Sequence, residues 1–372
     1  MGAKVKDILA VLDGAWPLAW AVPEDRVGLQ VGDPEAEVRE VLVALEVSAA
    51  VIAEARNLAV QLVLTHHPLL YQPLSALRED QPGGKLVAEI LRAGLALASW
   101  HTNLDLAPGG LNDYLAQGLE LQEVEVLGVV RRDPWLKLTV FVPVGYEDPV
   151  RTALMDDRIG VIGRYDYCSF AARGQGTYRP LAGAEPFQGK VGALARAEES
   201  RLEVLVPESR LSAALARLRA AHPYEEVAYD LYPLANPGLP LGFGRVGNWP
   251  GGVPWEEAMT RIKAVFGGGR VRLWGEPPSR VFRVAVCGGS GGDLIRAASE
   301  AGAQVYVTGE VRHHQAVPPP GPGPAVAEVG HFASEVVFMP AWARRLQELL
   351  EEQGLQVRIT AAAHETPPCC WL

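Results

Sequence analysis

The sequence has few cysteines, no excess of basic charge and no long apolar run, and each shortage excludes a class of protein. Four cysteines in 372 residues are too few for a disulfide framework. Acidic residues outnumber basic ones by 44 to 34, so a nucleic-acid partner is not expected. No stretch reaches the roughly 18 apolar residues of a membrane span, and Asp7 interrupts any signal-peptide core. We therefore expect a cytoplasmic protein with no membrane partner.

The length and the hydrophobic content of 48% predict more than one domain. Residues 41–65 and 284–308 align without a gap, as VLVALEVSAAVIAEARNLAVQLVLT and VAVCGGSGGDLIRAASEAGAQVYVT. Each segment has the pattern of an apolar strand, a loop, an amphipathic helix and a second apolar strand, which is a βαβ unit with a buried parallel pair. We predict an α/β fold built from two pseudo-repeated α/β halves, 1–128 and 241–372. A helix is expected at roughly 332–353.

The region between the halves, 129–240, has a different pattern. Its β-rich pieces, LKLTVFVPV and RLEVLVPE, alternate with helical stretches near 148–156 and 209–221. The order strand, helix, strand, strand, helix, strand is typical of a ferredoxin-like α+β unit. We therefore predict that this region is a domain inserted between the two halves.

Histidines and carboxylates gather where the predicted strands end. In open parallel sheets, ligands bind just beyond the carboxyl ends of the strands. A single histidine at such a position more often caps a loop than binds a ligand, but six at equivalent positions favour a shared site. The residues at these ends are His66, His67, His101, Asp105, Glu310, His313, His314 and His331.

Two of the candidates are spaced to act together, because His331 and Glu335 are four residues apart at a predicted helix start and share one face. With His66, His67 and Asp105 they supply three imidazoles and two carboxylates. This donor set suits zinc, iron, manganese or nickel, and a bridging carboxylate favours two ions. The alternative is that Glu335 pairs with a basic neighbour while His331 caps the helix.

Five motifs in order along the chain, DRVGLQVG, THHPL, HTNLD, TGE followed by HH, and GHFASE, resemble the Nif3-like (DUF34) family. Bacterial members of this family carry the name GTP cyclohydrolase 1 type 2 homolog. The middle region, with GRYDYCSF, GQGTYRP and HPYEEVAYDLYPL, resembles the PII/CutA-like insert of the longer members. The resemblance implies a homohexamer and two divalent metal ions per chain, with zinc the first choice. The implied ligands are His66, His67, Asp105, His331 and Glu335.

The sequence departs from the family pattern at Arg26, where Asn is usual, and at Glu46 and Glu310, where Asp is usual. Glutamate is longer by one methylene, so its carboxylate reaches the same place only with a shifted backbone. None of the five ligand positions is altered. His101 and His314 are predicted to be outer hydrogen-bond partners of the ligands or proton-transfer groups in catalysis.

Two further stretches each allow two interpretations. CGGSGGD, at 287–293, lies between a strand and a helix, where backbone N–H groups could cradle a phosphate, although a tight turn for close packing explains it as well. HPYEE, at 222–226, is either a turn that ends a helix or part of a second site.

The leading functional hypothesis is a metal-dependent hydrolase that acts on a small, nucleotide-like substrate. Under the family name, the attack would fall on C8 of the purine of GTP. That substrate follows from the resemblance alone, because neither composition nor spacing selects guanine. The alternative is a non-enzymatic metal-handling or regulatory protein whose insert senses a ligand.

Overall fold

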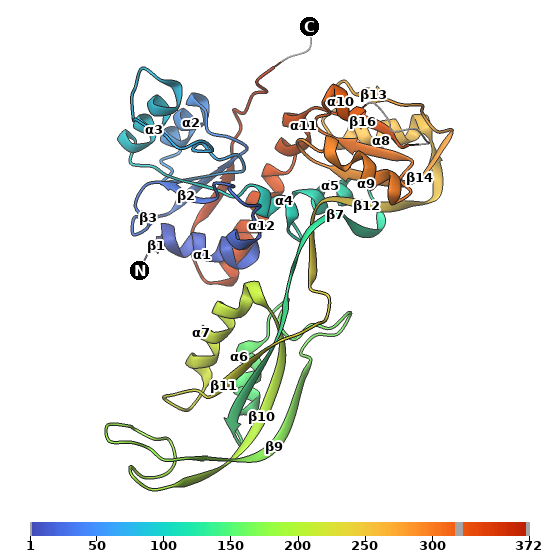
Figure 1. Cartoon of the computed structure of the whole chain (residues 1–372). Coiled ribbons are helices and arrows are strands. Elements are labelled where there is room, and N and C mark those ends of the chain that lie inside the picture. Colours follow the sequence, from blue (N-terminus) through green and yellow to red (C-terminus); the bar gives the residue numbers. More distant parts are fainter. Residues whose placement is uncertain (1, 317–322, 370–372) are drawn as a thin grey trace. The chain divides into compact units, whose positions relative to one another are not determined.

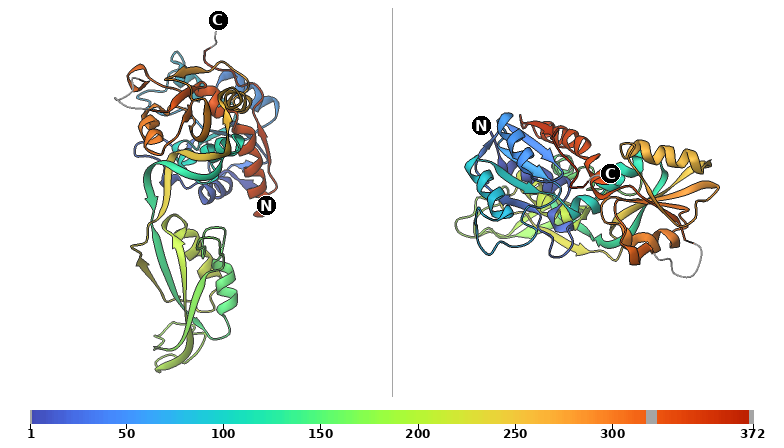
Figure 2. Two further views of the ribbon diagram at one scale, coloured as in Figure 1. Left: turned by 90° about the vertical axis from the view of Figure 1, so that its right-hand side faces the viewer. Right: turned by 90° about the horizontal axis from the view of Figure 1, so that it is seen from above.

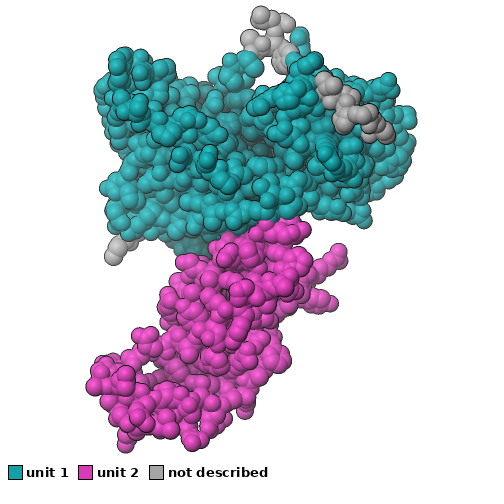
Figure 3. Space-filling model, in the orientation of Figure 1, with its two compact units in different colours: residues 1–131, 241–372 teal, residues 132–240 magenta. Residues whose placement is uncertain are grey.

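The computed structural model of this protein describes residues 2–316 and 323–369, which form two compact units (Figures 1 and 3). Unit 1 consists of Met1–Arg131 and Leu241–Leu372, and unit 2 is Arg132–Pro240. The architecture is a mixed α/β fold, as the sequence predicts. Among the described residues, no helix is both long enough and apolar enough to cross a bilayer.

The first sheet of unit 1 has the strand order β17-β4-β5-β6-β2, and its three central strands are parallel. Helices α2 and α3 contribute the buried side chains that pack with this sheet in one hydrophobic core. A short antiparallel pair, β1 with β3, lies at the start of the chain. The elements of this part are β1 (Ala3–Lys4), α1 (Val5–Ala15), β2 (Gly28–Val31), β3 (Glu37–Val38), β4 (Glu40–Ala44), α2 (Ala49–Asn57), β5 (Leu62–Thr65), α3 (Pro82–Arg92), β6 (Ala96–Ser99), α12 (Met339–Glu352) and β17 (Arg358–Ala361).

The second sheet of unit 1 has the order β13-β16-β15-β14-β12-β7, in which β14, β15 and β16 are parallel. Its elements are α4 (Thr102–Leu106), α5 (Leu111–Gly118), β7 (Gln122–Asp133), β12 (Leu239–Pro254), α8 (Trp255–Val265), β13 (Arg272–Trp274), β14 (Arg280–Cys287), α9 (Ile295–Glu300), β15 (Val305–Thr308), α10 (His313–Ala316), β16 (Ala325–Glu328) and α11 (His331–Val336).

The two aligned segments form βαβ units with the same register. In the first, Val41 on β4 pairs with Leu62 on β5, and in the second Val284 on β14 pairs with Val305 on β15. These two pairs occupy the same columns of the sequence alignment. A third parallel strand follows in each half, β6 and β16. The repeat expected from the apolar pattern is therefore present as a repeat of hydrogen-bonding register.

A glutamine side chain accepts backbone hydrogen bonds at the same position of both βαβ units. Gln61 Oε1 accepts hydrogen bonds from the backbone N–H groups of residues 39 and 40, at 2.8 and 3.0 Å. Gln304 Oε1 accepts from residues 282 and 283, at 2.6 and 3.2 Å. These donors directly precede Val41 and Val284, where the parallel pairing of each βαβ unit begins, so the glutamine side chain extends the hydrogen bonding between the two strands.

The two halves exchange their ends. Strand β17, near the C-terminus, pairs in parallel with β4, and α12 contacts both α1 and β4. Conversely, β7 belongs to the second sheet and α5 contacts β14. The view from above shows the red C-terminal helix and strand among the blue elements (Figure 2). Each sheet is thus completed by chain from the other half.

The helix expected at roughly 332–353 is two helices, α11 and α12, so that prediction was wrong. Residues Val337 and Phe338 separate them, and Pro340 lies in the first turn of α12. Proline has no N–H and its ring collides with the carbonyl four residues earlier, so it fits a first turn and not a helix interior.

Unit 2 has the element order β, α, β, β, α, β. Its antiparallel sheet has the strand order β11-β8-β10-β9, in which the first and third strands of the unit are central. Side chains of β8 and β10 form a buried core with α6 and α7. The elements are β8 (Trp135–Pro143), α6 (Glu147–Leu154), β9 (Ser169–Tyr178), β10 (Ala195–Pro207), α7 (Leu211–Ala221) and β11 (Tyr229–Pro233).

Candidate metal centre

The His66–His67 step leaves the regular ladder just after β5. The N–H of His66 donates to the carbonyl of Ala44, and the N–H of His67 donates to the carbonyl of Leu45. In an extended strand, successive N–H groups point to opposite sides, so two successive donors to one neighbour mark a departure from the strand. The two rings therefore lie together, with centroids 5.2 Å apart.

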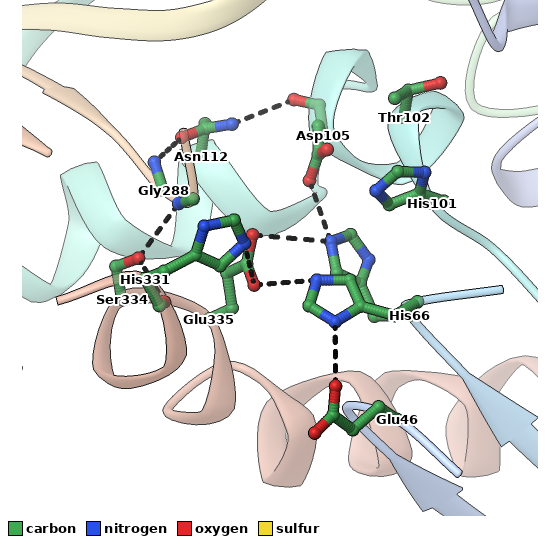
Figure 4. Close-up of polar contacts among 12 residues, drawn as sticks. Glu46, His66, His101, Thr102, Asp105, Asn112, Gly288, His331, Ser334 and Glu335 are labelled. Carbon is green, nitrogen blue, oxygen red and sulfur yellow. Dashed lines mark hydrogen bonds and ion pairs between the residues drawn. The ribbon is translucent and has the colours of Figure 1, made fainter. Parts of the chain in front are cut away.

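Four histidines lie with Nδ1 toward an acceptor of the protein, which leaves Nε2 for the interior of the cluster. Figure 4 shows His66, His101 and His331 beside the carboxylates of Asp105 and Glu335. Such outer partners fix the ring orientation and raise the basicity of the inner nitrogen. The Nδ1 contacts are His66 with the Trp100 carbonyl at 3.0 Å, His101 with Asp25 at 2.9 Å, His331 with Glu310 at 3.1 Å and His67 with Glu46 at 3.5 Å.

Three ligand-type atoms inside the cluster are buried and have no hydrogen-bond partner within the described part of the chain: His66 Nε2, Asp105 Oδ1 and Glu335 Oε2. His66 Nε2 lies 3.4 Å from the Asp105 oxygen, and Glu335 Oε2 lies 3.0 Å from His67 Nε2 and 3.3 Å from His331 Nε2. Buried polar atoms are normally hydrogen-bonded. Atoms that converge without such a bond fit a cation that binds them all.

The donors fall into two groups that share one residue. His66, His67 and His101 form the first group, and His67, His331 and Glu335 form the second. Within each group the ligand atoms lie within 4.8 Å of one another. Imidazole with carboxylate is the donor set of zinc and of several other divalent transition metals. These residues therefore could hold a metal ion.

The charges in the cluster are set by burial and by mutual contact. Burial lowers the pKa of His66 to about 3, so its ring is neutral, and burial raises the pKa of Asp105 to about 7. Burial would also lower the pKa of His67, but neighbouring carboxylates, Glu335 first, raise it to about 10. Contact with Glu335 raises the pKa of His331 to about 9. Without a cation, protons on two imidazoles balance the buried carboxylate, and a metal ion would replace them.

Glycine allows the turn that follows β14 to approach Glu335 closely. Gly289 has a φ of +63°, and a Cβ atom there would lie 2.3 Å from Glu335 Oε1. The Gly289 N–H donates to Ser334 Oγ at 2.9 Å, and the Gly288 N–H donates to Asn112 Oδ1 at 2.9 Å. Both N–H groups already have partners, which favours the tight-turn interpretation of CGGSGGD over a phosphate cradle. Asn112 also donates to the Asp105 carbonyl at 3.1 Å and so joins the two halves beside the cluster.

Four of the five predicted metal ligands, His66, His67, His331 and Glu335, belong to these two groups of donors, and His101 joins them in the first group. The fifth, Asp105, belongs to neither group, but its Oδ1 lies 3.4 Å from His66 Nε2. His314, predicted to take part in proton transfer, is exposed on α10 and belongs to neither group of donors among the described residues. Sequence reasoning missed Asp25, whose carboxylate accepts hydrogen bonds from His101 and from the backbone and side chain of Thr102. Its place in the motif DRVGLQVG was the available signal.

Comparisons with known proteins give a consistent result over the whole chain. A model of the family described as Duf34/NIF3 (NGG1p interacting factor 3) matches residues 3–368. A Bacillus subtilis (strain 168) protein named GTP cyclohydrolase 1 type 2 homolog is 38% identical over 367 residues, which cover 99% of this chain and 98% of that protein. A protein of the same name from Mycobacterium tuberculosis is 36% identical and covers 96% and 95% of the two chains.

Solved structures agree with this result. The crystal structure of a Bacillus cereus protein related to NIF3 matches with a TM-score of 0.86 at 35% identity, and the match covers 100% of both chains. A Staphylococcus aureus structure matches with a TM-score of 0.72 at 25% identity, covering 100% of this chain and 99% of the other.

Proposed function

This chain belongs to the Duf34/NIF3 family, and from that premise we propose that it is a metal-dependent hydrolase with two divalent ions per chain, acting on a nucleotide-like substrate. The proposed ligands are His66, His67, Asp105, His331 and Glu335, with zinc the first choice among the metals. His101 is the sixth side chain of the cluster.

One observation carries the proposal: buried nitrogen and oxygen ligand atoms from two halves of the chain converge to within 3.0–3.4 Å of one another without meeting hydrogen-bond geometry. Hydrogen-bonded polar side chains would explain a structural cluster, but buried polar atoms without a well-directed hydrogen bond are costly unless a cation binds them. When bound, divalent ions would supply Lewis acidity and lower the pKa of water.

The surrounding residues orient the donors. The carboxylates of Asp25 and Glu310 and the carbonyl of Trp100 each hold one imidazole at Nδ1, so each ring presents Nε2. Removing such an outer partner commonly lowers metal affinity or activity by 10- to 100-fold. Glu46 and Glu310, the two departures from the family pattern, contact Nδ1 of His67 and His331 at 3.5 and 3.1 Å and so can orient these rings.

The substrate class is the part of the proposal that rests on relatives. The name GTP cyclohydrolase 1 type 2 homolog points to a nucleotide and to hydrolysis. Phosphoester hydrolysis would use the same donor set equally well. A panel of substrates is therefore needed, with GTP as its first member.

The test combines metal content with turnover. The protein is loaded with zinc, iron or manganese, ions per chain are measured by elemental analysis, and each form is incubated with GTP and with phosphoesters. His67→Ala and Asp105→Ala should lose metal and activity together. His314→Ala is the matched control, because His314 is exposed outside the cluster.

Each outcome has a distinct meaning. Metal content unchanged in both ligand variants would refute the centre itself. Metal-replete protein that is inert toward every substrate would support the alternative, a metal-handling or regulatory protein, and would refute the hydrolase.

We further propose that residues 129–240 form an inserted ferredoxin-like domain of the PII/CutA kind and that the chain assembles as a homohexamer. The strand order β11-β8-β10-β9, with a helix after the first and after the third strand, supports the first of these proposals. Light scattering coupled to size-exclusion chromatography tests the second, and a mass of one chain would refute it.

A further inference from the structure

Unit 2 contains a cavity of about 400 Å³ that the metal centre does not explain. Val140 and Val142 of β8 and Leu202 of β10 face the helices in the buried core. Side chains alternate along a strand, so Phe141 and Glu199 face the other side of the sheet, where they line the cavity. The end of β9, the loop that follows it and the loop between α7 and β11 form the remaining walls. The volume is that of a small-molecule site.

A buried carboxylate lies in this cavity. Glu199 is only 8% exposed, and the hydroxyl of Tyr224 donates a hydrogen bond to its Oε1 at 3.0 Å. Burial and this carboxylate raise the pKa of Tyr224, so the hydroxyl keeps its proton. A carboxylate has about four acceptor positions, so one donor leaves acceptor capacity for a ligand. A buried negative charge is stable only when it is paired or well hydrogen-bonded.

Glycine makes the room for this carboxylate. A Cβ atom at Gly176, on β9, would lie 2.1 Å from Glu199 Oε2. Any larger residue would push the glutamate out of its place. Gly176 of the motif GQGTYRP, which lies outside the metal centre, therefore provides the space that Glu199 occupies in this cavity.

Aromatic rings surround the same place. The ring of Tyr224 lies 6.1 Å from that of Tyr178 and 5.9 Å from that of Phe187, measured between centroids. His222 fixes Tyr224, since the Tyr224 N–H lies 3.1 Å from His222 Nδ1 while His222 Nε2 lies 3.1 Å from the Phe141 carbonyl. Both ring nitrogens are thus satisfied by the backbone. The turn interpretation of HPYEE holds for its histidine, and the tyrosine and glutamates that follow it line the cavity.

The excess of acidic over basic side chains in the cavity favours a positively charged ligand. Three glutamates, Glu199, Glu225 and Glu226, line the cavity together with one arginine, Arg179. Both carboxylate oxygens of Glu225 lie near the backbone N–H of residue 185, at 3.0 and 3.1 Å, which leaves the buried Glu199 carboxylate as the main acceptor for a ligand. Aromatic faces carry partial negative charge and attract ammonium groups. We propose that this cavity binds a small organic cation, a protonated or quaternary amine whose nitrogen lies between the aromatic rings and the Glu199 carboxylate. This site is separate from the metal centre and does not depend on the proposed hydrolase activity.

The test uses choline as the probe and 3,3-dimethylbutan-1-ol, its uncharged isostere, as the control ligand. Binding to the full chain is measured by isothermal titration calorimetry and by saturation-transfer NMR. Choline should bind at least about tenfold more tightly than the isostere, because a desolvated cation–π contact and a carboxylate act on the charged nitrogen alone. Equal affinity for the two probes, or no binding of choline, would overturn the proposal.

Variants assign the binding to this cavity. Glu199→Gln and Phe187→Ala should each weaken choline binding by roughly tenfold. Glu203→Gln is the matched control, because Glu203 lies on the same strand and the same face, four residues away, where it pairs with Lys137 and Arg201. Phe187 is 44% exposed on a loop, so its removal should leave the fold intact, which circular dichroism would verify. Choline binding that is unchanged in both cavity variants would place the ligand elsewhere and refute the assignment.

Discussion

Replacing Gly289 by alanine tests whether Glu335 must occupy its present place for metal to bind. The added Cβ atom would lie 2.3 Å from Glu335 Oε1, whereas ordinary contacts of a Cβ atom begin near 3.4 Å. The carboxylate would have to retreat by about 1 Å, and metal–ligand distances tolerate only about 0.2 Å. Glu335 also lies within 3.3 Å of two imidazole nitrogens, those of His67 and His331, so its displacement disturbs the whole second group of donors.

The expected magnitude separates backbone strain from loss of the ligand. Alanine at a φ of +63° costs about 1 kcal/mol in folding free energy, wherever it occurs. Gly302 has a φ of +73° with no atom within 4 Å of its added Cβ, so Gly302→Ala carries the strain alone. Both variants should therefore lose about 1 kcal/mol of stability. Only Gly289→Ala should lose metal affinity, by at least about tenfold, which corresponds to about 1.4 kcal/mol.

The assay is competition for zinc against a chromophoric chelator, with the midpoint of thermal unfolding of the metal-free protein measured in parallel. Equal zinc affinity in Gly289→Ala and Gly302→Ala would refute the reasoning, because it would mean that the position of the Glu335 carboxylate does not matter for metal. A loss of affinity in both variants would also refute it, since strain alone would then explain the result.

Two further predictions concern stability. Asn112→Ala leaves the Gly288 N–H and the Asp105 carbonyl without their buried partner, so the free energy of unfolding in urea should fall by about 2–4 kcal/mol. Asp156 is partly buried, but the guanidinium of Arg217 and two backbone N–H groups hold its pKa below the ordinary value. A lowered folded pKa stabilises above about pH 4 and the effect is lost as pH falls through the folded pKa, so Asp156→Asn should destabilise by about 1–3 kcal/mol at pH 7 and by less at pH 3.

Each of these has a control in the chain. Asn57 is exposed at the end of α2, so Asn57→Ala should change stability by less than about 0.5 kcal/mol. A loss as small in Asn112→Ala would show that the link between the halves does not contribute. For Asp156→Asn, a difference from the natural protein that stays constant between pH 7 and pH 3 would contradict the assigned cause.

Several features of the fold were predictable because they are local. Apolar periodicity alone predicts the two βαβ units, and the structure contains both, with Val41 paired to Leu62 and Val284 paired to Val305 at equivalent positions. The order of strands and helices in unit 2 is likewise predictable from the sequence. The position of His66 and His67 at a strand end follows from where an apolar run stops, which needs no knowledge of distant contacts.

Only the tertiary structure decided which ends complete which sheet. Nothing in the pattern of Arg358–Ala361 indicates that this strand pairs with β4, since the pairing joins residues more than 300 positions apart. Pro340 accounts for the break between α11 and α12 locally, but the contact of α12 with α1 in the first half is visible only in the tertiary structure.

The candidate metal centre was likewise predictable in part from the sequence and in part only from the tertiary structure. The sequence by itself determined the donor types and their places at strand ends, because those follow from residue identity and strand boundaries. The tertiary structure decided that Asp25 orients His101, that His314 stays outside the cluster and that Glu199 is buried among aromatic rings. These facts depend on side-chain contacts between distant segments, and such contacts are fixed only when the packing of the whole unit selects one arrangement among the many that the local pattern allows.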